Sequence, residues 1–374
     1  MKAVAIFPST REVKLVDEPA PRIARPTDVR FRILDVGVCG TDKELCAFKY
    51  GTPPAGSDHL VIGHESLGEV VEVGEGVSRV AVGDLVVPMV RRPCPHPECV
   101  ACASGRQDFC STNDYTERGI KGRHGFLTEL VVDDERYLNV VPRTLRDVGV
   151  LVEPLTIAEK ALAQVRQIQQ RLPWACPTPT TPGQGANGCH RALVLGAGPV
   201  GLLGAMALAA DGFETFVYSR GGADSPRGRL VREIGGTFLE AETTRLADLP
   251  RRIGAIDVVY EATGVSALAF DALAVLGTNG VCVLTGVPGR APAPATVDTD
   301  RLMRGMVLQN QVLLGSVNAS REDFETAVRD LGTFRSRWPG ALGALITGRF
   351  PIDAYAGQLL AQPADAIKNV LTPA

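Results

Sequence analysis

Hydrophobic positions in the first 150 residues gather in short runs, and several of these runs alternate with polar residues. They cover residues 2–7, 28–38, 68–77, 83–90 and 125–134, with glycine, proline or aspartate between them. Short runs at this spacing, separated by turn residues, predict β-strands joined by tight connections. We therefore expect an antiparallel, barrel-like β domain in this part of the chain.

The pattern becomes helical at Glu153 and stays so to about Gln170, with Pro154 near the start as its only proline. Because proline is tolerated in the first turn of a helix, these residues predict one continuous helix. The segment LPWACPTPTTPGQGANG, residues 172–188, follows the helix and is rich in proline, threonine and glycine. It predicts a linker or surface insertion to which the sequence assigns no role.

Beyond the insertion, strand-like runs alternate with helical ones. Two helices are expected, at residues 199–212 and 227–236. The strands around them are expected at residues 191–196, 213–220, 255–264 and 280–287. Such alternation predicts a parallel, doubly wound sheet with helices on both faces, and hence an α/β fold.

Length sets the number of domains. The chain has 374 residues, of which 45% are hydrophobic and 22% charged, and this size suits about two domains. We expect a first domain over residues 1–187, a second domain over residues 188–316, and a return to the first domain over residues 317–374.

The charge balance argues against macromolecular partners. A formal net charge of −3 provides neither a basic stripe for nucleic acid nor a polybasic patch for membranes. Residues 192–210 are apolar enough for a membrane span, but glycines interrupt them in a pattern typical of a phosphate-binding turn. The N-terminal segment turns charged too early for a secretory signal. We expect a cytoplasmic protein that binds a small molecule, with no nucleic acid and no membrane.

Residues 194–201, VLGAGPVG, place Gly196, Gly198 and Gly201 in a G-x-G-x-x-G pattern between a strand and a helix. Glycines at these positions let the backbone approach a pyrophosphate, whose charge then meets the N-terminus of the helix. This context favours a dinucleotide site, and the alternative is a glycine-rich turn with a purely structural role.

The end of the next strand indicates which dinucleotide is bound. An NAD site usually places Asp or Glu there for the ribose hydroxyls, whereas this chain has Ser219 and Arg220. An arginine suits the 2′-phosphate of NADP through charge-assisted hydrogen bonds. We therefore expect NADP, with NAD as a second acceptor; the alternative is that Arg220 is a solvated surface residue.

Four of the nine cysteines lie close together in CPHPECVACASGRQDFC, at Cys94, Cys99, Cys102 and Cys110. In a cytosolic chain such clustering indicates metal ligation rather than disulfides. Four thiolates brought together by tight turns form a closed tetrahedral zinc site. We expect a structural zinc in this lobe, residues 94–110, and the alternative is a group of buried free thiols.

A second set of metal-binding side chains is dispersed along the chain. Cys39 lies in GVCGTD, His64 and Glu65 in GHE, and Glu153 in VEPL, each at the end of a strand-like run or the start of a helix. Cysteine, histidine and carboxylate ligands with one open position suit a catalytic zinc. Isolated CG and HE pairs are more often structural, so this set needs a family pattern to support it.

These motifs, in this order and at these separations, resemble the zinc-containing medium-chain alcohol dehydrogenase superfamily over essentially the whole chain. Residues 39–65, 117–129, 152–162 and 313–318 look most like its glucose 1-dehydrogenase subfamily. The resemblance implies a GroES-like antiparallel β-barrel catalytic domain and a Rossmann domain with a doubly wound parallel sheet. We further expect two zinc ions per chain and a homo-oligomer, either a dimer or a tetramer.

The resemblance also implies roles for the dispersed ligand set. Cys39 and His64 bind the catalytic zinc, with Glu65 and Glu153 as carboxylate ligands or near-ligands. Classical alcohol dehydrogenases place a cysteine as the third ligand, whereas this chain has Glu153 there, as the polyol and sugar enzymes do. The spacing between the first two lobe cysteines is two residues longer than usual, and Val90 stands where related sugar enzymes carry asparagine.

Three further side chains match substrate-contacting positions of the family, and Glu153 lies near the substrate as well. Thr41 matches the hydroxyl that contacts the substrate oxygen and relays its proton, while Glu117 and Asn318 match positions that hydrogen-bond sugar hydroxyls. The cofactor positions of the family fall on Gly196, Gly198, Pro199, Val200, Gly201, Ser219, Arg220, Thr263, Gly264 and Gly286.

The expected reaction is oxidation of the C1 hydroxyl of an aldose, D-glucose to D-glucono-1,5-lactone, by hydride transfer to the nicotinamide. One alternative is a polyol or amino-alcohol dehydrogenase of the same superfamily. Another is a catalytically silent protein that binds NADP on this fold, although the intact zinc ligands argue against it.

Overall fold

The computed structural model describes residues 1–374 except 175, 177–186, 290–295, 362–364 and 374. The chain divides into two compact units. Helix α3 (Val152–Gln169) lies mostly in the second unit, whereas the sequence placed its whole length in the first domain. The first unit comprises Met1–Thr156, Asn318–Arg335 and Leu342–Ala374, and the second comprises Ile157–Val317 and Ser336–Ala341.

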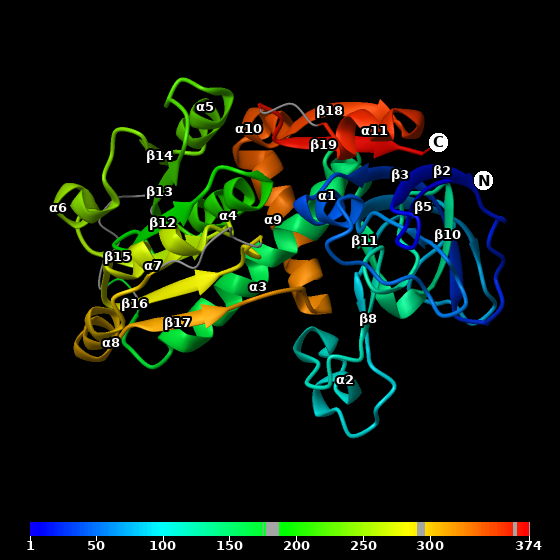
Figure 1. The fold of residues 1–374 in the computed structure, drawn as a ribbon, viewed down its shortest axis with the longest axis horizontal. Coiled ribbons are helices and arrows are strands. Elements are labelled where there is room, and N and C mark those ends of the chain that lie inside the picture. Colours follow the sequence, from blue (N-terminus) through cyan, green and yellow to red (C-terminus); the bar gives the residue numbers. More distant parts are fainter. Residues whose placement is uncertain (175, 177–186, 290–295, 362–364, 374) are drawn as a thin grey trace. The chain divides into compact units, whose positions relative to one another are not determined.

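The first unit is built around a seven-stranded sheet in the order β11-β6-β5-β3-β19-β18, with β10 paired to β3 (Figure 1). Its pairs are antiparallel apart from β18 with β19. Phe31 and Ile33 of β3 are fully buried in a core that also contains Leu60 and Phe126. The strands are β3 (Asp28–Gly37), β5 (Glu65–Val73), β6 (Leu85–Pro88), β10 (Leu130–Asp134), β11 (Leu138–Val141), β18 (Ile346–Pro351) and β19 (Lys368–Thr372).

Two smaller sheets and several short helices complete this unit. One sheet has the order β2-β1-β4, and the other has the order β7-β8-β9 beside the cysteine lobe. The strands are β1 (Lys2–Phe7), β2 (Glu12–Asp17), β4 (Leu60–Val61), β7 (Arg91–Arg92), β8 (Thr116–Arg118) and β9 (Gly122–Arg123). The helices are α1 (Gly40–Cys46), α2 (Val100–Ala103) and α11 (Tyr355–Leu359), while α9 (Arg321–Arg337) and α10 (Pro339–Ala344) each have residues in both units. The predicted antiparallel β domain is confirmed.

The second unit contains a six-stranded parallel sheet in the order β14-β13-β12-β15-β16-β17 (Figure 1). The strand order reverses at β12, whose neighbours are β13 and β15, and this is where ligands bind in doubly wound sheets. The strands are β12 (Arg191–Leu195), β13 (Glu214–Ser219), β14 (Thr237–Glu240), β15 (Ile256–Glu261), β16 (Leu276–Leu284) and β17 (Val312–Gly315). The helices besides α3 are α4 (Pro199–Ala210), α5 (Pro226–Glu233), α6 (Leu249–Ile253), α7 (Ser266–Leu273) and α8 (Thr299–Leu308).

The parallel sheet confirms the predicted doubly wound architecture. Residues 192–210 form most of β12, the glycine turn and α4. Within the described residues, every helix is too short or too polar to cross a membrane. The sequence missed β14 and α6, because four and five residues are too few to show a period.

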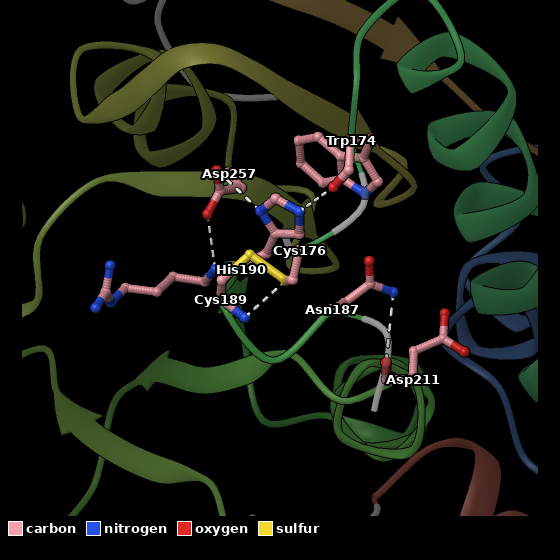
Figure 2. Close-up of a disulfide and its surroundings, with 8 residues drawn as sticks. Trp174, Cys176, Asn187, Cys189, His190, Asp211 and Asp257 are labelled. Atoms are coloured by element: carbon pink, nitrogen blue, oxygen red, sulfur yellow. Dashed lines mark hydrogen bonds and ion pairs between the residues drawn. A yellow bond between two sulfur atoms is a disulfide. The ribbon is translucent and has the colours of Figure 1, made fainter. Parts of the chain in front are cut away.

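The insertion predicted at residues 172–188 lies largely outside the described residues. Its two flanks are described, and a disulfide joins Cys176 to Cys189 (Figure 2). The sequence did not predict this pairing. The other seven cysteines of the described chain are free thiols.

Candidate active site

Three of the predicted ligands of the catalytic metal come from two adjacent strands. Cys39 follows β3 and is the N-cap residue of α1, whereas His64 and Glu65 stand at the start of β5. Gly37 of β3 pairs with Glu65 in the sheet, which brings the two chain segments together. The ligand atoms of Cys39, His64 and Glu65 lie within 4.8 Å of one another, and His64 and Glu65 are buried. The structure therefore gathers these three side chains into one group.

Glu65 packs closely against Gly37 and forms an ion pair with Lys368. A Cβ atom on residue 37 would lie 2.2 Å from Glu65 Oε2, so only glycine fits at Gly37. Lys368 of β19 donates hydrogen bonds to Glu65 Oε2 at 2.5 Å and to the carbonyl of Val38 at 3.1 Å. Burial opposes the charge on Lys368, but Glu65 raises the pKa of this ammonium group. Lys368 thus fixes Glu65, and the sequence analysis missed it.

Asp42 holds the group from the side of α1. Its Oδ2 accepts a hydrogen bond from the backbone N–H of Cys39 at 2.9 Å, and its Oδ1 lies 3.3 Å from His64 Nδ1 without hydrogen-bond geometry. Burial opposes protonation of His64, but Asp42 and Cys39 raise the pKa of its imidazole well above the usual value. A carboxylate behind a ligating histidine fixes the ring and its tautomer. Asp42 was also missed, although it lies in the GVCGTD motif.

Glu153 lies in the first turn of α3 and is buried, but it stands outside the 4.8 Å group. Burial raises the pKa of Glu153 to about 7, with Glu65 adding to the shift and His64 opposing it. The site thus holds a thiol, an imidazole and two buried carboxyl groups, beside the ammonium group of Lys368. Cysteine, histidine and carboxylate side chains are the ligand types of zinc, so this donor set fits zinc.

Thr41 occupies the first turn of α1, two residues after Cys39, and is half-buried. Burial raises the pKa of the nearby Tyr50 phenol to about 12, and a side-chain hydrogen bond with Thr41 opposes the shift. Thr41 therefore has a hydroxyl neighbour that sequence analysis did not predict.

The two predicted sugar-binding residues meet in the first unit. Asn318 Nδ2 donates to Glu117 Oε1 at 3.0 Å across 201 positions of sequence. Arg91, which pairs with Glu117 in the β7–β8 ladder, places Nε and Nη2 at 3.0 Å from the same oxygen. The Tyr115 ring packs against the guanidinium at 3.7 Å. Among the described residues these contacts all end on Oε1, which leaves Oε2 of Glu117 as the acceptor for a ligand.

The four lobe cysteines also converge. The sulfur atoms of Cys94, Cys99, Cys102 and Cys110 lie within 4.8 Å of one another. The N–H groups of Cys102 and Ser111 lower the pKa of Cys99, which favours a thiolate there. Four sulfur atoms at this separation fit a closed tetrahedral zinc site.

The glycine turn of the second unit has the geometry of a phosphate cradle. Gly196 has φ +101°, and a Cβ atom on Gly201 would lie 2.1 Å from the Gly196 carbonyl oxygen. Gly198 is the N-cap residue of α4, and Pro199 and Val200 open the helix, so free N–H groups face the turn. A Cβ atom on Gly198 would meet nothing within 4 Å, which leaves the approach to the turn open.

The other predicted cofactor residues lie at the carboxyl ends of the central strands. Ser219 ends β13 and accepts a hydrogen bond from the N–H of Ala197 at 3.3 Å, and Arg220 is exposed beside it. Glu261, the last residue of β15, accepts hydrogen bonds from the N–H groups of Thr263 and Gly264 at 2.6 and 2.9 Å. Gly286 follows the end of β16 and its N–H reaches the Glu261 carbonyl at 3.3 Å. Glu261 is the organising residue that sequence analysis missed.

Comparison with known proteins places the chain in a class. The alcohol dehydrogenase GroES-like domain model matches residues 25–143, and the model of the glucose dehydrogenase C-terminus matches residues 146–372. Together with the GroES-like and Rossmann-type units, these matches define a medium-chain alcohol dehydrogenase of the zinc-containing superfamily. Within that superfamily, the chain belongs to the glucose dehydrogenase subfamily.

Individual relatives are similar over nearly the whole chain. A glucose 1-dehydrogenase from Methanocella arvoryzae is 38% identical, over 94% of both chains. One from Thermoproteus tenax is 40% identical over 95% of this chain and 94% of its own. Among solved structures, a Haloferax mediterranei glucose dehydrogenase in complex with NADP, zinc and gluconolactone is 32% identical. It superimposes with a TM-score of 0.88 over 100% of this chain and 99% of its own.

Proposed function

We propose that this chain is a zinc-dependent glucose 1-dehydrogenase that oxidises D-glucose to D-glucono-1,5-lactone with NADP as hydride acceptor and NAD as a second acceptor. The observation that carries the proposal is the buried group of Cys39, His64 and Glu65. The matched glucose 1-dehydrogenases and the relative that holds NADP, zinc and gluconolactone support the sugar and the cofactor.

The predicted metal ligands and Thr41 each have a defined part in this reaction. Cys39 and His64 would hold the catalytic zinc, with Glu65 or Glu153 as the carboxylate ligand. Bound zinc supplies a Lewis acid that lowers the pKa of the C1 hydroxyl. The Thr41 hydroxyl accepts the proton of that hydroxyl and passes its own proton outward to neighbouring groups and solvent. The C1–H bond breaks, its electron pair goes to the nicotinamide as hydride, and the lactone C=O forms.

Glu117 and Asn318 orient the sugar. Oε2 of Glu117 accepts a hydrogen bond from a ring hydroxyl, while Oε1 stays bound to Arg91 and Asn318. A site that hydrogen-bonds hydroxyls rejects analogues that lack them, because its own polar groups are then left unpaired. This supports an aldose rather than a simple alcohol as substrate.

The second unit binds the dinucleotide at its glycine turn. Free N–H groups at the start of α4 receive the pyrophosphate, and Ser219 and Arg220 receive the 2′-phosphate of NADP. Thr263, Gly264 and Gly286 line the same edge of the sheet, where Glu261 fixes their loop.

The four-cysteine lobe takes a second zinc with a structural role. Four sulfur ligands leave no open coordination position for substrate. The proposal therefore predicts two zinc ions per chain. The catalytic zinc can be removed without unfolding the four-cysteine lobe.

We further propose that the chain forms a homo-oligomer and works in the cytoplasm. At the edge of the parallel sheet, β17 pairs among the described residues only with β16, and Met303, Val307 and Leu308 of the neighbouring α8 are more than half exposed. Exposed apolar side chains beside an open strand edge suit a second copy of the chain as partner. The free thiols at both metal groups suit a reducing compartment, whereas the Cys176–Cys189 disulfide is of a kind that is rare there. Light scattering distinguishes a dimer from a tetramer, and a monomer at micromolar concentration contradicts the oligomer.

A screen of substrates tests the activity. Aldoses, polyols, amino alcohols and simple alcohols are each offered with NADP and NAD, and formation of the reduced nicotinamide is followed by its absorbance. We expect D-glucose with NADP to give the highest kcat/KM. Activity on a polyol or an amino alcohol with none on any aldose would contradict the glucose assignment, and inactivity of a zinc-loaded chain on every substrate would favour a silent NADP-binding protein.

A further inference from the structure

The disulfide of the second unit joins the two flanks of an insertion to which the sequence assigned no role. Cys176 lies beyond the end of α3, and Cys189 lies two residues before β12. The strand β12 leads directly into the glycine turn at Gly196. The bond therefore lies just before the amino end of β12, whereas the glycine turn follows its carboxyl end.

The two sulfur atoms of the bond are not equivalent. Cys189 is exposed, whereas Cys176 is partly buried. The backbone N–H of Cys189 donates a hydrogen bond to Cys176 Sγ at 3.0 Å. In thiol–disulfide exchange the accessible sulfur is attacked, and the other sulfur leaves with the bonding electron pair. The N–H group stabilises the negative charge that then develops on Cys176.

The imidazole of His190 lies beside both sulfur atoms. A ring nitrogen of His190 and the two sulfurs lie within 4.8 Å of one another. His190 Nε2 lies 2.5 Å from the carbonyl oxygen of Trp174, and because a carbonyl only accepts, this nitrogen carries a proton. His190 Nδ1 lies 3.6 Å from Asp257 Oδ1 on the other side (Figure 2).

The surroundings hold this imidazole in place and favour its charged form. The Trp174 ring stacks on it with centroids 3.9 Å apart. Burial opposes protonation, but Asp257 and the Trp174 carbonyl raise the pKa of His190. A histidine cation beside a cysteine lowers the pKa of that thiol, which makes the cysteine a better leaving group.

We propose that Cys176 and Cys189 form a thiol-exchange site, at which a small thiol adds to Cys189 as a mixed disulfide and Cys176 leaves as a thiolate. The incoming thiolate forms a new S–S bond to Cys189 Sγ while the Cys176–Cys189 bond breaks. The bonding pair stays on Cys176 Sγ, next to the N–H of Cys189 and the His190 cation. One disulfide is lost and one is formed, so no further oxidant or reductant is needed.

The same three side chains have the donor types of a metal site, and the geometry favours exchange instead. Both ring nitrogens of His190 already face a partner, Trp174 on one side and Asp257 on the other. The two sulfur atoms are bonded to each other. A metal would require both arrangements to be broken.

Peptide mass spectrometry of the zinc-loaded chain tests the proposal. The protein is purified without reductant, incubated with reduced glutathione and quenched with N-ethylmaleimide. We expect glutathione on Cys189 and N-ethylmaleimide on Cys176, while the fully buried Cys282 stays unmodified in the folded chain. Glutathione on Cys176 instead, or two free thiols before any glutathione is added, would overturn the proposal. A third zinc bound per chain after reduction would overturn it in favour of a metal site.

Replacing His190 tests whether its charge, rather than a structural contact, promotes the exchange. His190→Gln keeps a side chain that donates to the Trp174 carbonyl and removes the charge. The rate of adduct formation at neutral pH should fall, because the pKa of the leaving Cys176 thiol rises and a thiol of higher pKa leaves more slowly. The rate in wild type should also fall as pH rises through the pKa of His190 once it is corrected for the thiolate fraction of glutathione. His59→Gln, a histidine of the first unit between two carboxylates, is the control and should leave the rate unchanged. An equal rate for wild type and a folded His190→Gln variant would contradict the role of His190.

Discussion

Replacing Arg91 with methionine tests whether a neighbouring cation holds the sugar-binding carboxylate in place. Nε and Nη2 of Arg91 both lie 3.0 Å from Glu117 Oε1. The two side chains are 6% and 13% exposed, so water screens this contact little. A hydrogen bond to a charged group contributes about 1.5–3 kcal/mol. If the loss of orientation costs about 2 kcal/mol, kcat/KM for glucose falls about thirtyfold.

Steady-state kinetics with NADP measure this loss and show where it falls. In the proposed function Glu117 would contact ring hydroxyls in the ground state and the transition state alike, so most of the loss should appear in KM. Arg91→Lys should lie between wild type and Arg91→Met, because an ammonium group cannot make the two-nitrogen contact. Arg136→Met is the matched control, since it breaks a two-nitrogen pair with Asp134 elsewhere in the first unit.

The outcomes separate the role of Arg91 from that of Glu117. A folded Arg91→Met variant with unchanged kcat/KM, beside a Glu117→Gln variant with a lower value, would refute the positioning role of Arg91. Unchanged values in both variants would refute the sugar-binding role of Glu117 itself. A thermal unfolding curve for each variant shows that the comparison is between folded proteins.

Three further predictions concern the cofactor, a buried ion pair and the metals. Arg220→Glu should lower the preference for NADP over NAD by about 10- to 100-fold, because a hydrogen bond to a phosphate contributes about 1.5–3 kcal/mol; unchanged preference in kinetics with both cofactors would contradict the role of Arg220. Burial opposes ionisation of Asp133, but Arg118 and Arg92 lower its pKa far below the usual range. Its contribution to stability is therefore complete above about pH 4 and is lost as pH falls below it, and Asp133→Asn should lower the free energy of unfolding in urea by about 3–5 kcal/mol at neutral pH. Zinc analysis should give two ions per chain for wild type and one each for Cys39→Ser and Cys102→Ser. Of these two variants, only Cys39→Ser should keep its thermal stability, and its kcat should fall about a thousandfold.

The architecture was predictable because its signals are local. Strand residues of the first unit and the strand–turn–helix around Gly196 are each encoded in a few consecutive positions. Residues 2–7 were predicted as a strand and form β1, and residues 199–212 were predicted as a helix and form α4 over Pro199–Ala210. Short elements such as β14 fall below the length at which periodicity is visible.

The supporting residues of the site were not predictable, because their partners are distant in sequence. Lys368 reaches Glu65 across 303 positions, because β19 and β5 both pair with β3. Arg91 faces Glu117 through a strand register that no local pattern reveals. The Cys176–Cys189 bond was missed for a similar reason, since nothing in the composition of the insertion brings its two flanks together.

Deuterium transfer from D-glucose labelled at C1 tests the central claim most directly. The zinc-loaded chain is incubated with the labelled sugar and NADP, and both products are isolated for NMR. If the C1 hydroxyl is oxidised by direct hydride transfer, the label appears at C4 of the reduced nicotinamide and is absent from the lactone. A reduced nicotinamide without deuterium, or a sugar product that keeps the label at C1, would contradict the account.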